Sequence, residues 1–177
     1  MDRALLQRAQ TVFDRADQCL VDLGATKHLD EIEMHWAYFL VNFERIFHRI
    51  AAAAGGPGDA WYGRVATFRK TDPLLKYLLH ARNADEHGIA DVTQQKPEQI
   101  REVGVTPISP NDATELTVHF DVVDPHVALT DVIDRSVSYS VPTTFRGGAI
   151  ATAHPLNVGL LALSYAAEVL SEAWSDC

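Results

Sequence analysis

The clearest helical periodicity in this sequence lies in residues 29–50, LDEIEMHWAYFLVNFERIFHRI. Large apolar residues recur there at steps of three and four: Leu29, Ile32, Trp36, Phe39, Leu40, Phe43, Ile46, Phe47 and Ile50. This spacing places them on one face of an α-helix, which we predict over residues 26–52. The stripe is continuous and apolar, so it indicates a buried core face and not a cofactor site.

Helical patterns also flank this segment. Apolar residues at the same spacing predict a helix over residues 4–23 and another over about residues 156–174. The connection between residues 4–23 and 26–52 is short, so these two helices should be antiparallel neighbours in a bundle.

Two shorter helices are predicted between the long ones. Gly55-Gly56-Pro57-Gly58 ends the second helix, and Asp59 is a suitable N-cap for the next. Asp72 followed by Pro73 repeats the start signal, because proline is favoured in the first turn of a helix. We expect this fourth helix to end at Gly88.

The pattern changes after about residue 91, where prolines make long helices unfavourable. Residues 115–122 and 136–141 alternate apolar and polar, which predicts strands, and residues 127–133 are expected to form a helical turn. The predicted fold is mainly α: an up-and-down helical bundle of about five helices with a small antiparallel β annex at about residues 112–142. The annex should cover one side of the helices. We treat residues 1–177 as one domain whose helical core is about 1–90 and 156–174.

Composition restricts the classes of function. The chain has 177 residues, 47% of them hydrophobic, and a formal net charge of −9. No apolar run approaches the ~18–20 residues that span a bilayer, so we expect no membrane partner and a cytoplasmic protein. Cys19 and Cys177 do not make a disulfide framework. The acidic balance argues against a broad basic surface for nucleic acid.

The motif with the most chemistry is Arg82-Asn83-Ala84-Asp85-Glu86-His87. On a helix, Asn83 and His87 are four residues apart and share a face, whereas Arg82 and His87 are about 140° apart around the axis. Arg82 and His87 could therefore flank a cleft, or meet the same residues of a second subunit across a two-fold axis.

The motif, placed after two long amphipathic helices, resembles that of the HEPN superfamily, helical-bundle proteins that include many metal-independent endoribonucleases. The resemblance covers the helical part of the chain and not the strands. It implies a homodimer with Arg82, Asn83 and His87 as catalytic residues, and neither a metal nor a cofactor. The sequence also resembles uncharacterised bacterial proteins that have a similar motif and a proline-rich C-terminal half. This second resemblance implies no activity.

These residue types suit RNA cleavage by attack of the 2′-hydroxyl on the neighbouring phosphate. His87 could act as the base near neutral pH, Arg82 could bind the phosphate oxygens, and Asn83 could orient His87. Basic residues between positions 64 and 76 could guide RNA toward Arg82. Three residues are weaker candidates for substrate binding: Arg69, Lys76 and His80.

Two other interpretations remain open. Arg82 and Glu86 have the spacing of an ordinary helix ion pair, and His87 could simply favour the helix C-terminus. The chain could then be a catalytically inactive HEPN-like module that binds a nucleotide, RNA, an antitoxin or another protein in a defence or toxin–antitoxin system, or a structural dimerisation domain. The nuclease hypothesis requires positive potential near Arg82, and neutralisation by Asp85 and Glu86 would favour the non-catalytic alternatives.

Overall fold

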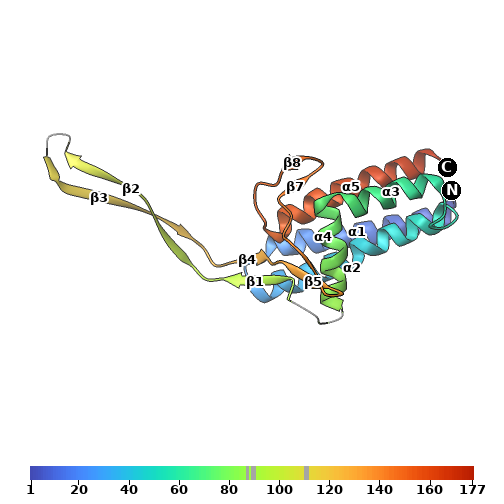
Figure 1. The fold of residues 1–177 in the computed structure, drawn as a ribbon, viewed down its shortest axis with the longest axis horizontal. Coiled ribbons are helices and arrows are strands. Elements are labelled where there is room, and N and C mark those ends of the chain that lie inside the picture. The colour runs from blue at the N-terminus through green and yellow to red at the C-terminus, as the bar shows by residue number, and fades with distance from the viewer. Residues whose placement is uncertain (87, 89–90, 110–111) are drawn as a thin grey trace.

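The computed structural model describes residues 1–86, 88, 91–109 and 112–177, and it is mainly helical (Figure 1). Its five α-helices are α1 (Arg3–Ala25), α2 (Leu29–Ala53), α3 (Ala60–Thr71), α4 (Pro73–Glu86) and α5 (Pro155–Ser175). The predicted fold class, a helical bundle with antiparallel strands, is confirmed.

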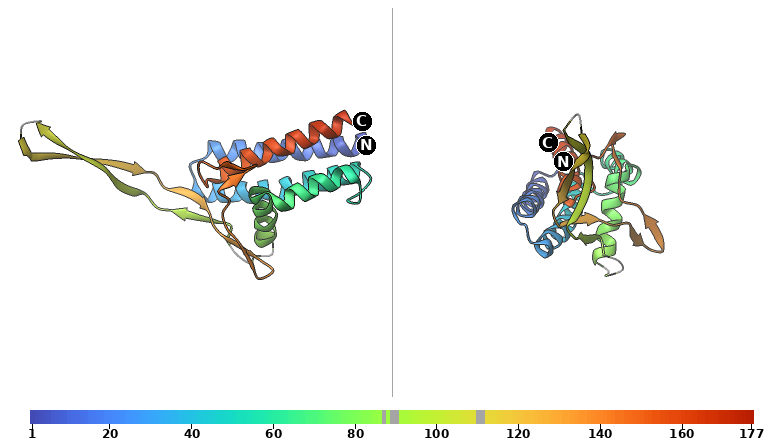
Figure 2. Two further views of the ribbon diagram at one scale, coloured as in Figure 1. Left: turned by 45° about the horizontal axis from the view of Figure 1, so that its top comes forward. Right: turned by 90° about the vertical axis from the view of Figure 1, so that its left-hand side faces the viewer.

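The bundle is built from α1, α2, α3 and α5, which run along one axis, while α4 crosses them (Figures 1 and 2). α1 and α2 are antiparallel, as the short connection predicts, and α5 packs against both. Gly159 of α5 allows this close approach, since a Cβ atom there would lie 2.5 Å from Leu20 Cδ2 of α1. The apolar stripe of α2 forms the centre of the core, with Trp36, Phe39 and Phe47 each 0% exposed.

The helix boundaries follow local signals. Asp59 Oδ1 accepts a hydrogen bond from the Tyr62 N–H at 2.9 Å, which caps α3. Asp72 Oδ1 accepts from the backbone N–H groups of Leu74 and Leu75 at 3.0 and 3.2 Å, and Pro73 occupies the first position of α4. Both caps satisfy N–H groups that have no partner inside the helix.

The two ends of the described chain lie together, at the end of the bundle remote from the strands (Figure 1). The Asp2 N–H donates to the Ala53 carbonyl at 2.9 Å, which attaches the start of α1 to the end of α2. Cys177 Sγ lies 3.5 Å from the Met1 carbonyl oxygen. The start of α1 and the end of α5 are therefore neighbours.

The strands form four two-stranded antiparallel sheets. They are β1 (Thr93–Lys96) with β4 (His126–Leu129), β2 (Gln99–Ser109) with β3 (Asp112–Val123), β5 (Val132–Asp134) with β6 (Val137–Tyr139), and β7 (Thr144–Phe145) with β8 (Gly148–Ala149). The strands thus extend beyond the predicted annex, about residues 112–142, at both ends. The helical turn predicted at residues 127–133 is wrong, because β4 and β5 occupy that segment.

The hairpin β2–β3, which we call the arm, projects from one end of the bundle (Figures 1 and 2). The prediction that the strands cover one side of the helices is therefore wrong for the arm. It holds for β5 and β7, which pack against α4. β1 and β4 form the root of the arm, where Val127 is 0% exposed and joins the core.

Candidate functional site

The polar face of α4 presents the motif. Leu74, Leu75, Tyr77 and Leu78 are buried in the core, whereas Lys76, His80 and Asn83 lie on the outer, less buried face of the helix. His80 and Asn83 are three residues apart and share this outer face. The strands that follow α4 fold back against the same face, and β5 makes most of the contact.

Asp134 of β5 is the residue that joins this face to the strands. His80 Nδ1 lies 2.8 Å from Asp134 Oδ2, and Asn83 Nδ2 donates to the same oxygen at 3.0 Å. The Asp134 side chain is 4% exposed. The hydrogen bonds from His80 and then Asn83 hold the pKa of Asp134 below its ordinary value, so the carboxylate accepts and His80 donates.

Aromatic contacts strengthen the same junction. The His80 ring stacks on Tyr139 of β6 with centroids 3.6 Å apart and ring planes 12° apart. Lys76 Nζ lies 5.5 Å from the Tyr139 ring centroid, within cation–π range. His80 and Lys76, both predicted as substrate-binding residues, therefore contact β5 and β6 of the same chain.

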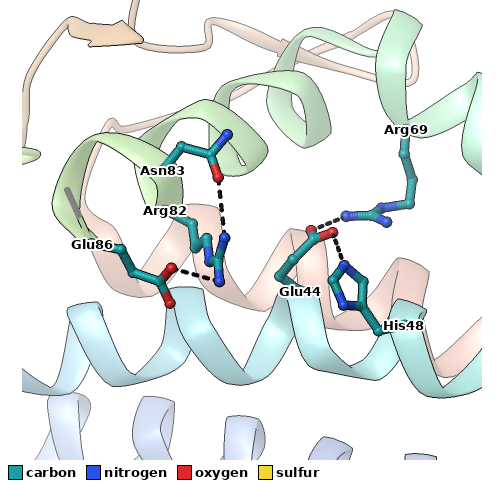
Figure 3. Close-up of polar contacts among 6 residues, drawn as sticks. All are labelled: Glu44, His48, Arg69, Arg82, Asn83 and Glu86. Carbon is teal, nitrogen blue, oxygen red and sulfur yellow. Dashed lines mark hydrogen bonds and ion pairs between the residues drawn. The ribbon is translucent and has the colours of Figure 1, made fainter. Parts of the chain in front are cut away.

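Arg82 is paired within its own helix. Its Nη2 lies 2.6 Å from Glu86 Oε2, and its Nη1 donates to Asn83 Oδ1 at 3.2 Å (Figure 3). The two side chains of the ion pair are 27% and 33% exposed. Arg82 Nε is buried and has no hydrogen-bond partner in the part of the chain that the structure describes. The third predicted catalytic residue, His87, lies outside the described residues.

Arg69, the remaining predicted substrate-binding residue, is buried. Figure 3 shows Arg69 reaching from α3 toward Glu44 of α2, with which it forms an ion pair. The side chains are 8% and 10% exposed, and the guanidinium carbon of Arg69 lies 3.8 Å from the Phe47 ring centroid. His48 Nε2 lies 3.2 Å from the other oxygen of Glu44. Arg69 therefore connects α2 to α3 rather than projecting into solvent.

Two cavities adjoin these groups. One of about 620 Å³ lies beside the Glu44–Arg69 pair and is lined also by His48, Tyr62 and Lys70. Another, of about 720 Å³, lies near the end of α4, and its lining includes three carboxylates, from Glu33, Asp85 and Asp91. Burial, and next the neighbouring Glu86, raise the pKa of Asp85. The surroundings of the motif are thus acidic.

Among the described residues, no group of three or more histidine, cysteine or acidic side chains could hold a metal ion. No helix in the described part of the chain is long and apolar enough to cross a bilayer. No known family model matches the chain, and neither a curated protein nor a solved structure shows significant similarity to it. The HEPN resemblance therefore stays a prediction from the motif.

Sequence reasoning missed the partners of the motif. Asp134 is 51 residues from Asn83 and 54 from His80, and no spacing rule connects positions so far apart. In the sequence, Tyr139 is simply one position of the alternating segment 136–141. Glu44 had a usable signal, because an acidic residue directly after Phe43 in an otherwise apolar stripe must be either exposed or paired.

Proposed function

We propose that this chain is a non-catalytic protein-binding module in which the helical bundle supports the arm and the arm binds a protein strand. The single observation that carries the proposal is the arm itself, which projects from the bundle as two strands with no described strand beside either outer edge. Such edges present unpaired backbone N–H and C=O groups, and they bind another strand by extending the sheet.

The contacts of the motif support a structural role for it. Asn83 directs its amide to Asp134 and its carbonyl oxygen to Arg82, while Glu86 neutralises Arg82. The nuclease hypothesis required positive potential at this place, and the nearby cavity is lined by carboxylates instead. Acidic side chains repel the phosphates of RNA, so this arrangement favours the non-catalytic interpretation.

The experiment is an RNA cleavage assay with the purified full chain in the presence of EDTA, with His87→Ala as the matched variant. We expect both proteins to leave single-stranded RNA intact. Cleavage by the unmodified chain that disappears in His87→Ala would overturn the proposal. Circular dichroism of both proteins excludes a folding defect as the cause of any difference.

A metal-independent, HEPN-like endoribonuclease is the second candidate, and the exposure of the Arg82–Glu86 pair favours it. Exposed ion pairs contribute only about 0–1 kcal/mol, so a phosphate could displace Glu86 at small cost. Arg82 would then bind the phosphate, His87 would take the proton of the 2′-hydroxyl, and Asn83 would orient His87 in a homodimer cleft. On this hypothesis Glu86→Gln should increase cleavage, because it frees Arg82.

A further inference from the structure

The arm has too few strands to be stable in isolation. It pairs from Gln99 with Val123 to Ser109 with Asp112, and no described strand extends this two-stranded sheet. An isolated two-stranded hairpin is at best marginally stable in water, because it cannot bury an apolar face between layers. A further strand at one of its open edges would stabilise the arm.

The two edges of the arm are not equivalent. β2 contains Pro107, which has no backbone N–H, and its register shifts between Glu102 and Gly104 and again between Pro107 and Ser109. Prolines and bulges protect a strand edge from pairing. β3, by contrast, pairs residue after residue from Leu116 to Val123 and contains no proline. The regular edge that can accept another strand is therefore residues 116–123 of β3.

We propose that this edge pairs with the same edge of a second copy of the chain, antiparallel and centred on His119. A two-fold axis makes such a contact self-complementary and closed. Residues directly opposite in an antiparallel pair share one face of the sheet. With His119 opposite itself, position 116 meets 122 and position 118 meets 120. The four alternating apolar positions of β3 then meet only one another.

Neighbouring registers of the same pair are less favourable. Centring the pair on Val118 instead would place Glu115 opposite Asp121, and like charges directly opposite destabilise a sheet. Centring it on Phe120 would place the apolar position 116 opposite Asp124. A one-residue slip of a single strand would set apolar positions against polar ones.

The proposed dimer rests on the proposed function, since it names the protein strand that the arm binds. It also keeps the two bundles apart. Val123, the end of β3 next to the root, would lie opposite position 115 of the second copy. The two roots would thus be separated by eight residues, or about 27 Å at ~3.4 Å per residue. The two copies of the α4 motif would then not share a cleft.

The test is cysteine cross-linking in a chain that carries Cys19→Ser and Cys177→Ser. Opposite Cα atoms in an antiparallel pair are about 4.5–5.5 Å apart, within the range of a disulfide. We expect His119→Cys to give a covalent dimer on mild oxidation. Thr106→Cys, on the irregular β2 edge, is the matched control and should stay monomeric on a non-reducing gel. Sedimentation of the unmodified chain should show a dimer.

A chain that sediments as a monomer over the micromolar range, or equal cross-linking through positions 106 and 119, would overturn the dimer. That failure is distinct from failure of the proposed function. A monomer that leaves RNA intact refutes only the self-pairing, whereas RNA cleavage that depends on His87 refutes the non-catalytic role. Circular dichroism of both cysteine variants should match that of the parent chain, since the bundle does not depend on these positions.

Discussion

The bundle and the strand region between α4 and α5 differ in how far polar contacts contribute to their stability. In the bundle, the aromatic residues of α2 stack in sequence, with ring centroids 5.2 Å apart for Trp36 and Phe39 and 5.5 Å for Phe39 and Phe43. In the strand region, Val127, Leu129 and Val132 join the same core, and polar contacts centred on Asp134 add to this connection. Burial of apolar area stabilises both, and in the strand region hydrogen bonds to Asp134 also fix the position of β5. Substitutions should therefore have graded effects, largest in the bundle.

The largest effect is expected for Phe43→Ala. Phe43 is 2% exposed and lies between Phe39 and Phe47, so its truncation leaves a cavity in the centre of the core. We expect a loss of about 3–5 kcal/mol in the free energy of unfolding, measured by urea denaturation. Ile133→Ala is the control in β5, where the side chain is 49% exposed and the change should stay within about 0.5 kcal/mol. Similar losses for the two variants would contradict the comparison.

An effect of similar size is expected at the Glu44–Arg69 ion pair. Among the described residues, Arg69→Leu leaves the buried Glu44 with His48 as its one remaining ion-pair partner, and removal of one member of a buried pair typically costs about 3–5 kcal/mol. The double variant Glu44→Leu/Arg69→Leu should recover most of this loss, since no charge then stays buried. Thermal or urea unfolding of the unmodified chain, Glu44→Leu, Arg69→Leu and the double variant tests this. A double variant no more stable than Arg69→Leu would show that the pair is not the cause.

A smaller effect is expected at the junction between α4 and β5. Asp134→Ala leaves His80 and Asn83 without their acceptor, which should cost about 1–3 kcal/mol. Asp131→Ala is the matched control, because Asp131 accepts from the Val141 N–H at an exposed site and should cost less.

The Asp134 contribution should also depend on pH. Its pKa is lowered in the folded state, so the stabilisation is complete above the unfolded value of about 3.9 and is lost as the pH falls through the lower folded value. The difference in unfolding free energy between the unmodified chain and Asp134→Asn should therefore be larger at pH 7 than at pH 2. A difference that does not change over this range would contradict the assigned hydrogen bonds.

The smallest effect is expected at His154, where the strand region rejoins the bundle. His154 Nδ1 accepts from the Leu156 N–H at 3.2 Å and caps α5. Burial, and then the nearby His126, lower the pKa of His154, so folding favours the neutral ring. The contribution is complete above the unfolded pKa of about 6.5 and declines as the pH falls below it, by up to about 1 kcal/mol.

The matched variant for this prediction is His154→Asn. Asparagine is a good N-cap and does not titrate, so the variant should keep the cap and lose the decline in stability between pH 7.5 and pH 5.5. Urea unfolding at the two pH values measures both. If the stability of the variant depends on pH as strongly as that of the unmodified chain, another group causes the pH dependence.

The bundle was predictable from the sequence because helices carry local signals. The stripe of α2 repeats over many turns, and the Asp59 and Asp72 caps precede their helices directly. The strands were harder, since their pairing joins distant positions. Gly104 and Pro107 interrupt the alternation of β2, so that strand was not predicted at all. The short apolar segment at 127–133 fits a helical turn and a strand equally well by periodicity.

In the candidate site, too, local contacts were predictable and long-range contacts were not. Arg82 and Asn83 could be identified from a local motif, and the Arg82–Glu86 pair follows from a spacing of four residues. The contact of Asn83 with Asp134 could not be identified, because it depends on how β5 returns to α4. The contacts of the motif outside its own helix therefore became visible only with the fold.

The neighbouring ends of the described chain have a mechanical consequence. α1 and α5 are antiparallel and their free ends lie side by side, remote from the arm (Figure 1). A force applied between these two ends would separate the helices one turn at a time, as a zipper opens, instead of shearing them past each other. The same force would not be transmitted through the arm. Single-molecule pulling from the termini should thus open the bundle at low load, while traction on the arm would act at the opposite end of the molecule.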